Sequence, residues 1–245
     1  DVKRMLLQMR GLTEAGRALS FYTIAAEDRS HHCVDPDSQQ HNQRLVEILT
    51  PLVKGWCTEV SMEITSLGVQ VHGGMGFVEE TGAAQHMRDA RILPIYEGTN
   101  GIQALDFIGR KCLRDGGEGL TDLLAEMLAM AESTCSDCSS IKALLTALRV
   151  AVGQCQDALD QVLANPSNSQ YMAYNFMMLF GNSVGYWLLV RLAIAAKSRI
   201  EQGSKDRFYQ QKIATAEFFA SQLLTRNAGY LGAIIADTGS YDDFV

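Results

Sequence analysis

One acidic side chain stands where the sequence could place a catalytic base. Glu97 lies between the aromatic Tyr96 and Gly98, just ahead of an expected helix start. A carboxylate held in an apolar cleft has its pKa raised toward neutrality, which suits it to remove a weakly acidic carbon-bound proton. A second interpretation stays open at this point, in which Glu97 is an exposed loop acid or a partner of the dipole of the next helix.

A glycine-rich segment earlier in the chain could bind a phosphorylated ligand. The segment reads Gln70-Val71-His72-Gly73-Gly74-Met75-Gly76-Phe77. Glycines expose backbone N–H groups and let a ligand approach closely, which suits phosphate or pyrophosphate. Glycine also ends ordinary helices, so the segment has a purely structural interpretation as well.

Helical patterns must position both segments. Apolar residues recur every three to four positions over 3–29 and again from Leu52 to Leu67, which predicts two long core helices. The polar stretch 30–40 between them predicts a loop that leads into a short helix over 41–49. Thr50-Pro51 then resembles a helix cap followed by proline at the first helical position.

The segment around Glu97 is expected to connect two further helices. We predict a short helix over 81–91 and an extended stretch over 92–97, because Pro94 disfavours helix in the residue before it. Thr99 can cap a helix that runs to about Arg114.

The strongest linker signal divides the chain near residue 115. It is Gly116-Gly117-Glu118-Gly119, and helical patterns follow it over 120–133, 139–163, 167–201 and 205–236. We therefore predict an all-α protein, with an up-down helical bundle over 1–115 and a second helical bundle over 116–245.

The cysteines give no support to a metal site. The six cysteines form no even framework and are expected to be free thiols. Cys135 and Cys138 have the spacing of half a metal site, but no second pair or histidine cluster follows nearby. His31-His32-Cys33 lies among polar residues in the expected loop. We predict no bound metal.

Composition argues against two classes of partner. The formal charge of -7 argues against nucleic acid, and no apolar stretch reaches the roughly 20 residues that cross a bilayer. With no signal-peptide pattern, we expect a cytoplasmic protein, or a mitochondrial-matrix protein in a eukaryote. The chain opens with Asp1 inside an amphipathic pattern, which indicates a piece cut from a longer protein.

Taken together, the two segments resemble the acyl-CoA dehydrogenase family. In that family a Gln-x-x-Gly-Gly-x-Gly-Phe/Tyr turn precedes Arg-Asp-Ala-Arg/Lys and Ile-Tyr-Glu-Gly-Thr, and the same order occurs here from Gln70 through Arg88-Asp89-Ala90-Arg91 to Thr99. The continuation Asn100-Gly101-Ile102-Gln103 is similar to the larger bacterial-type members, which carry an extra C-terminal helical domain.

The resemblance implies a flavin-dependent oxidation of an acyl-CoA thioester to its 2,3-enoyl product. Glu97 would remove the α-proton, the Glu97 N–H would stabilise the developing enolate, and FAD would accept hydride. An electron-transferring flavoprotein would reoxidise the flavin, and the enzyme would act as a homo-oligomer.

The same resemblance implies a set of binding residues. Those implied to contact FAD, usually that of a neighbouring subunit, are Gln70, Val71, His72, Gly73 and Gly74. Thr99 and Gly101 correspond to further FAD contacts, although many members have Gln where Gly101 stands. Gly98 would lie beside the thioester.

The chain lacks the segments that would complete such a site. It has no run of alternating β-branched strands, so it cannot supply the middle β-domain of the family, and it has no counterpart of the N-terminal helical domain. We therefore expect the chain on its own to be inactive and to bind FAD weakly. The alternative is a non-catalytic helical interaction or oligomerisation module derived from the same family.

Overall fold

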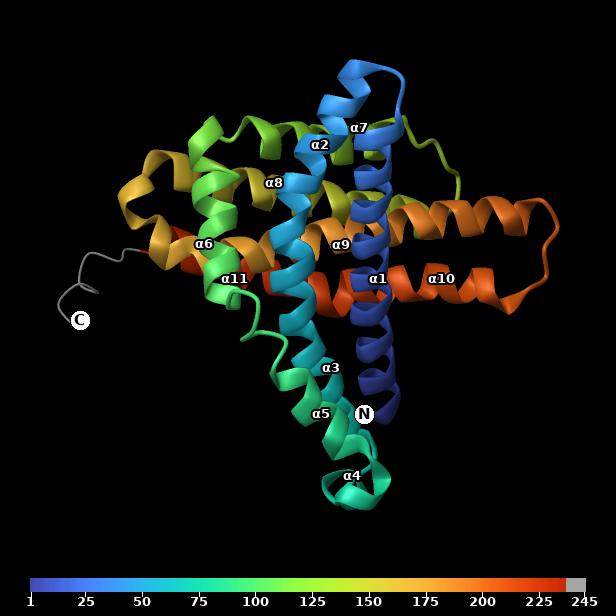
Figure 1. Ribbon diagram of the computed structural model, residues 1–245. Helices are drawn as coiled ribbons and strands as arrows, with labels where there is room; N and C mark the ends of the chain where they lie inside the picture. Colours follow the sequence, from blue (N-terminus) through green and yellow to red (C-terminus); the bar gives the residue numbers. More distant parts are fainter. Residues whose placement is uncertain (237–245) are drawn as a thin grey trace.

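The computed structural model shows an elongated layer of helices crossed by a second group that projects away from it (Figure 1). The structure describes residues 1–236, and within them it contains helices and turns but no strand. The predicted all-α class is confirmed. The α-helices are α1 (Val2–His32), α2 (Pro36–Pro51), α3 (Cys57–Val71), α4 (Gly74–Phe77), α5 (Ala83–Arg91), α6 (Asn100–Arg110), α7 (Glu118–Ser133), α8 (Ser139–Ala164), α9 (Ser169–Glu201), α10 (Arg207–Phe218) and α11 (Asn227–Ile235).

Short helices of other types connect several of these elements. The π-helical turns are η1 (Leu52–Trp56) and η5 (Phe219–Leu223), and the 3₁₀ turns are η2 (Glu79–Thr81), η3 (Leu113–Asp115), η4 (Pro166–Asn168) and η6 (Leu224–Arg226).

The loop predicted over 30–40 is much shorter than expected. Helix α1 continues to His32, and α2 begins at Pro36. Asp35 caps α2 by accepting a hydrogen bond from the Ser38 N–H at 3.0 Å, and proline suits the first helical position because its missing N–H needs no partner there. The polar residues that suggested a loop are therefore surface residues of helices.

The predicted helix start at Thr50-Pro51 is wrong. Helix α2 runs through both residues into η1 and then α3, and the Thr50 hydroxyl donates to the Val46 carbonyl of its own helix at 2.6 Å. Proline inside a helix removes one N–H and crowds the carbonyl four residues earlier. The π turn that follows Pro51 is a known accommodation of such a defect.

Helix α9 is the centre of the molecule. Every residue from 176 to 190 is buried, and α9 packs against α1, α6, α8, α10 and α11. An all-round apolar helix of this kind belongs to a core.

The expectation that no segment is long and apolar enough to cross a bilayer needs correction. The helical stretch Pro166–Glu201 is long and apolar enough by length and composition. However, 83% of its most apolar window is buried inside the protein.

The two predicted halves share one hydrophobic core. The Phe107 ring of α6 lies 5.4 and 5.5 Å, centroid to centroid, from the Phe176 and Phe180 rings of α9. Gly116 and Gly117 form a tight left-handed turn before α7, with φ of 67° and 83°. The division into domains near residue 115 stays a prediction, and its last nine positions lie outside the described residues.

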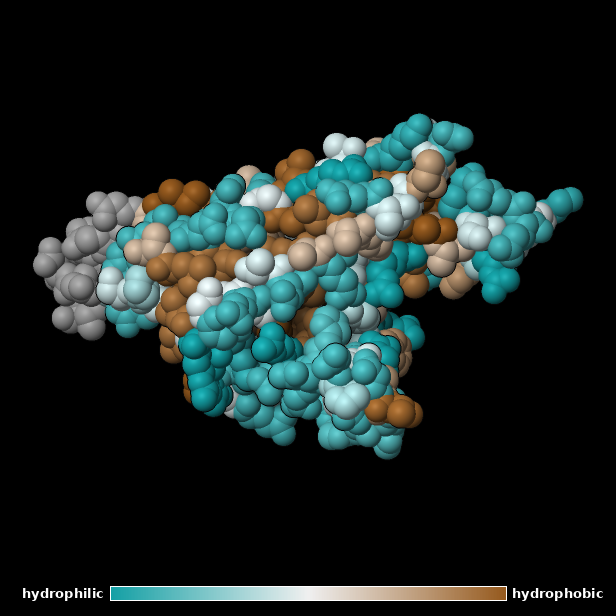
Figure 2. Space-filling model, turned by 90° about the horizontal axis from the view of Figure 1, so that it is seen from above, coloured by the Kyte–Doolittle hydropathy of each residue, from teal (hydrophilic) through white to brown (hydrophobic). Residues whose placement is uncertain are grey.

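The single helix predicted over 205–236 is interrupted. Asp206 caps α10 by accepting from the Phe208 N–H at 2.9 Å. Turns η5 and η6 then separate α10 from α11, and Phe219 of η5 stacks on Tyr186 of α9 with ring centroids 5.9 Å apart. Seen from above, apolar residues follow the long body between bands of polar residues (Figure 2).

Candidate active site

Glu97 lies in a compact turn between α5 and α6. The Leu93 N–H donates to the Ala90 carbonyl and the Tyr96 N–H to the Ile92 carbonyl, each at 3.1 Å. The extended stretch predicted over 92–97 is therefore wrong, because local hydrogen bonds fold these residues back after α5. Such a turn brings Glu97 to the surface just before α6 begins.

The backbone of Glu97 is strained. Its φ is 54°, and it is the only non-glycine residue with positive φ among the residues that the structure describes. A left-handed conformation costs an L-residue with a Cβ roughly 1–3 kcal/mol, and such strain gathers at functional sites. Gly98 continues the left-handed path with φ of 85° at no such cost.

Asn100 fastens the turn to the bundle. This buried side chain donates to the Gly55 carbonyl at 3.2 Å and to the Glu59 carboxylate at 2.9 Å, while its backbone N–H donates to the Pro94 carbonyl at 3.0 Å. Its side-chain oxygen accepts from Thr58 at 3.0 Å. Buried polar groups that are fully paired fix one conformation, so the turn has a defined position relative to α3.

Lys54 of η1 joins the same network. Its ammonium donates to the Leu93 carbonyl and to the Asn100 side-chain oxygen, each at 3.0 Å. Burial lowers the pKa of Lys54, and the opposing carboxylates of Glu97 and Glu59 act in the other direction. A positive charge therefore lies within electrostatic reach of Glu97.

The other residues expected beside Glu97 are in the same turn. Thr99 caps α6, as predicted, by accepting from the Ile102 N–H at 3.3 Å. A Cβ at Gly98 would lie 3.2 Å from the Gln103 side chain, so a larger residue would crowd α6. Gly101 has room for a side chain, because its nearest neighbour would be the Thr99 hydroxyl at 3.6 Å.

The glycine-rich segment ends α3 as predicted. Helix α3 ends at Val71, and Gly73 follows with φ 61° and ψ -146°, a conformation open only to glycine. A Cβ on Gly73 or Gly74 would meet nothing within 4 Å, so this backbone is open to an approaching group. Gly76 is needed for a different reason, because its Cβ would lie 2.2 Å from the Val69 carbonyl oxygen.

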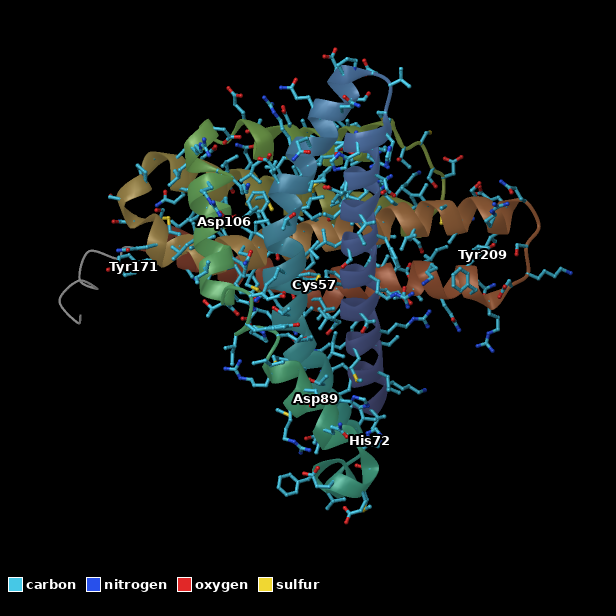
Figure 3. The ribbon with its side chains drawn as sticks, viewed as in Figure 1. Cys57, His72, Asp89, Asp106, Tyr171 and Tyr209 are labelled. Carbon is cyan, nitrogen blue, oxygen red and sulfur yellow. The ribbon has the colours of Figure 1, made fainter. Side chains whose placement is uncertain are left out.

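The two candidate segments do not meet within this chain. Figure 3 shows His72 near the end of the projection, and Asp89 of α5, the helix that leads to the Glu97 turn, closer to the crossing of the helices. Helix α5, nine residues long, separates the glycine-rich turn from the Glu97 turn by roughly 13 Å. Gln70, Val71, His72, Gly73 and Gly74 therefore form one exposed or half-buried group, and the residues from Glu97 to Gly101 form another.

Two surface clefts flank the glycine-rich turn. One, of about 360 Å³, lies between α1, α3 and α5 and includes His72, Gly68 and His86. The other, of about 600 Å³, lies between the end of α3 and α5 and includes Phe77 and Met87. Phe77 is 81% exposed there, which leaves an apolar side chain beside the open backbone.

Arg88 of α5 and the buried thiols of Cys57 and Cys155 have surroundings of their own, apart from these two groups. Arg88 forms a two-point pair with Glu79 at 2.6 and 2.7 Å. Burial raises the pKa of the Cys57 and Cys155 thiols to about 12, which makes them unreactive. In residues 1–236, no three His, Cys, Asp or Glu side chains gather as metal ligands.

Sequence reasoning did not identify Lys54 or Asn100. Lys54 lies 46 residues before Asn100, and no local pattern connects them. The misplaced helix start at Pro51 also put Lys54 in an ordinary first turn rather than in a π turn. The only sequence signal for Asn100 was weak: it is a polar residue directly after the capping Thr99. In the structure it is buried.

Family models match almost the whole described chain. Residues 1–113 match the acyl-CoA dehydrogenase C-terminal domain, and residues 123–242 match a domain described as acetyl-CoA dehydrogenase C-terminal like. The chain belongs to the acyl-CoA dehydrogenase family. The resemblance found in the motifs is thereby confirmed.

Curated acyl-CoA dehydrogenases align along the full chain. A 3-methylmercaptopropionyl-CoA dehydrogenase of Ruegeria pomeroyi is 46% identical over 98% of this chain and 41% of its own length. A butyryl-CoA dehydrogenase of Syntrophomonas wolfei subsp. wolfei is 30% identical over 99% of this chain and 41% of its own length. The chain thus spans about two fifths of the length of these relatives.

Solved structures of the family share the fold. An acyl-CoA dehydrogenase from Bacillus anthracis complexed with FAD superposes with a TM-score of 0.72 at 18% identity, over 98% of this chain and 43% of the other. Caenorhabditis elegans ACDH-11 in complex with C11-CoA gives 0.71 at 20% identity, over 90% of this chain and 36% of the other. At these identities the likeness concerns the helical architecture.

Proposed function

We propose that this chain is the C-terminal part of an FAD-dependent acyl-CoA dehydrogenase that oxidises an acyl-CoA thioester to the 2,3-enoyl-CoA. The family membership and the alignment with two fifths of longer relatives support this proposal. The rest of such a protein would supply the remaining walls of the site. The chain alone is then inactive, because a water-excluding site needs those walls.

The observation that carries the proposal is the strained and anchored Glu97. A structural loop acid has no reason to keep a left-handed backbone, whereas a base must be held where its proton donor will lie. Apolar side chains surround it at the surface: Ile95, Tyr96 and Ile102 are 48%, 45% and 56% exposed. An acyl chain or a covering segment would bury these side chains and exclude water from the carboxylate.

Each remaining residue then has a defined task. Glu97 takes the α-proton, and its own backbone N–H donates to the thioester oxygen as negative charge develops there. Gly98 leaves space for the thioester. The chemistry that FAD supplies when bound is the acceptance of hydride from the β-carbon.

The open glycine turn fits a phosphorylated cofactor. Gln70, Val71, His72, Gly73 and Gly74 would hold the FAD of a neighbouring subunit, while Thr99 and Gly101 would face the FAD of their own. The separation of the two groups along α5 supports this division, since one compact cofactor site in one subunit would not need both. This division implies a homo-oligomer. From the family resemblance we also propose an electron-transferring flavoprotein as acceptor, and from the sequence the cytoplasm or mitochondrial matrix as location.

The test is Glu97→Gln in the full-length flavoprotein. We expect FAD to stay bound, while acyl-CoA no longer bleaches the flavin in a stopped-flow instrument. Glu132→Gln is the matched control, because Glu132 is an exposed acid on α7. Bleaching at an unchanged rate in Glu97→Gln would place the base elsewhere. A full-length protein that binds no flavin would instead support the helical interaction or oligomerisation module.

A further inference from the structure

Lys54 reaches both ends of the turn that carries Glu97. Its ammonium bonds the Leu93 carbonyl, before Glu97, and the Asn100 side chain, after it, each at 3.0 Å. The Lys54 ammonium therefore joins the two ends of the segment 93–100. Without it, the Leu93 carbonyl and the Asn100 oxygen would each lose a charged donor.

The π turn is what brings Lys54 to this place. Pro51 interrupts the regular hydrogen bonding of the α2–α3 helix, and η1 inserts an extra residue per turn directly after it. Such an insertion changes the direction of the side chains that follow. The π turn packs closely on α9, because a Cβ on Gly55 of η1 would lie 2.3 Å from the Met177 sulfur. The turn cannot shift without repacking the core.

The two carboxylates that act on Lys54, those of Glu59 and Glu97, differ in their hydrogen bonding. Glu59 of α3 accepts a hydrogen bond from Asn100 at 2.9 Å and another from the Tyr174 hydroxyl of α9. Burial and the nearby Glu59 charge both raise the pKa of the Tyr174 phenol. Glu97 has no hydrogen bond or ion pair with another residue of the described chain, and its charge acts on Lys54, whose pKa it raises against the effect of burial. The Glu97 carboxylate, unlike that of Glu59, thus has no hydrogen-bond donor of its own within the described chain.

We propose that Lys54 is a positioning residue for Glu97, holding its strained turn at both ends. This inference rests on the proposed role of Glu97 as the base. Lys54 does not itself touch the reacting atoms. It acts by fixing the place of the carboxylate before substrate arrives.

The experiment compares Lys54→Ala with the wild-type full-length flavoprotein, with and without ethylamine. We expect flavin bleaching by acyl-CoA to slow by roughly 100-fold, the scale for displacement of a catalytic group by about 1 Å. The dissociation constant of the acyl-CoA should change by less than about 3-fold, because Lys54 contacts no substrate. Added ethylamine, but not propanol, should restore the rate in proportion to its concentration.

A second variant covers the case in which Lys54→Ala does not fold. Lys54→Gln keeps two N–H donors but removes the charge, and we expect it to bleach at least 10-fold more slowly than wild type. Lys212→Met is the control, because Lys212 is also a partly buried lysine, paired with Glu14 at 3.0 Å, but it joins α10 to α1. It should bleach at the wild-type rate.

Three results would overturn the inference. The first is an unchanged rate in Lys54→Gln. The second is a slow Lys54→Ala that ethylamine does not restore. The third is a parallel loss of rate, bound FAD and thermal stability, which a merely structural lysine would give. Glu97→Gln, measured alongside, separates the two proposals: if it still bleaches, the proposed base is wrong, whereas if it alone fails to bleach, only the role of Lys54 is wrong.

Discussion

The indole N–H of Trp56 donates a hydrogen bond to the side-chain oxygen of Asn182, 2.9 Å away and 126 residues later in the chain. Asn182 in turn donates to Asn227 at 3.2 Å, and Asn227 donates to Ser183 at 2.9 Å. All four side chains are buried. A polar chain therefore runs through the core from η1 across α9 to α11.

Replacing Asn182 should destabilise the fold strongly. Asn182→Ala leaves the Trp56 N–H and the Asn227 oxygen without partners, which costs about 3 kcal/mol in free energy of unfolding. Urea denaturation measures this loss. The control is Asn165→Ala, whose side chain donates only to Gln161 at the end of α8, and we expect it to cost about 1 kcal/mol or less. Equal losses in both variants would mean that the buried chain adds nothing.

Gly181 permits the closest approach between α9 and η1. A Cβ there would lie 2.3 Å from Cγ of the fully buried Trp56, so Gly181→Ala should cost about 3 kcal/mol. Gly55→Ala meets a flexible methionine end instead and should cost less. Gly153→Ala on α8 meets nothing within 4 Å and should stabilise by about 0.5–1 kcal/mol. Thermal unfolding gives the order, and a neutral Gly181→Ala would contradict the packing described.

Because the backbone of Glu97 is strained, asparagine should stabilise the fold at this position, although it destabilises a regular helix. Asparagine tolerates left-handed backbone, whereas valine does not. Glu97→Asn should therefore raise the free energy of unfolding of the chain by about 0.5–1 kcal/mol, and Glu97→Val should lower it by about 1 kcal/mol. At Glu132, in the regular helix α7, asparagine should instead destabilise by a few tenths of a kcal/mol. If both positions respond alike, Glu97 is not strained.

Gly101 should accept the glutamine that many family members carry. The open space around its Cβ and its place inside α6 predict that Gly101→Gln gains about 0.5–1 kcal/mol in stability. In the full-length flavoprotein the new side chain should also slow the release of FAD. Flavin fluorescence on dilution measures that release. Faster release would remove Gly101 from the proposed cofactor contacts.

The pair of Glu63 and Arg226 gives the fold a defined pH dependence. Burial alone would raise the pKa of Glu63, but hydrogen bonds from Arg226 and Gln8 outweigh it and hold the pKa below the ordinary 4.5. Because the folded pKa is depressed, the stabilisation is present above pH 4.5 and is lost as the pH falls through the lower folded value. Arg226→Met should thus cost about 1–2 kcal/mol at neutral pH and much less in acid.

The control for this pair is Arg88→Met. Arg88 holds Glu79 with similar geometry, but both side chains are more than half exposed, at 56% and 69%. Solvent screening makes such a pair nearly worthless. Urea unfolding at several pH values should therefore show no change for Arg88→Met, and a cost for Arg226→Met that stays constant with pH would refute the linkage.

Local patterns predicted the helices whose boundaries depend on local chemistry. The Thr99 cap, the end of α3 at the glycines and the long core helices all follow from capping and apolar spacing. Except for the loop expected over 30–40, where the local cap at Asp35 was missed, the errors occurred where tertiary packing decides. Pro51 lies inside a helix where η1 packs against α9. Residues 92–97 form a turn that local hydrogen bonds close and that Lys54, distant in the sequence, holds in place.

The site was predictable to the same extent. Glu97 and the glycine-rich turn were recognised from ordered motifs, and the family comparison confirms the membership those motifs suggested. Their roles remain proposals. The left-handed φ of Glu97 could not be predicted, because nothing in the sequence marks a glutamate for a conformation that glycine normally occupies.

The burial of α9 on all sides has a consequence for how the chain is made. Helices α1 to α3 and α6 are synthesised first, yet the surface they must cover appears only with α9. At ribosomal rates of roughly 5–20 residues per second, the 126 residues between Trp56 and Asn182 take roughly 6–25 seconds to emerge. During that interval α1, α2 and α3 can pack on one another, but the faces that α1 and α6 present to α9 have no partner within the chain. The core of the bundle therefore closes only after α9 has been synthesised.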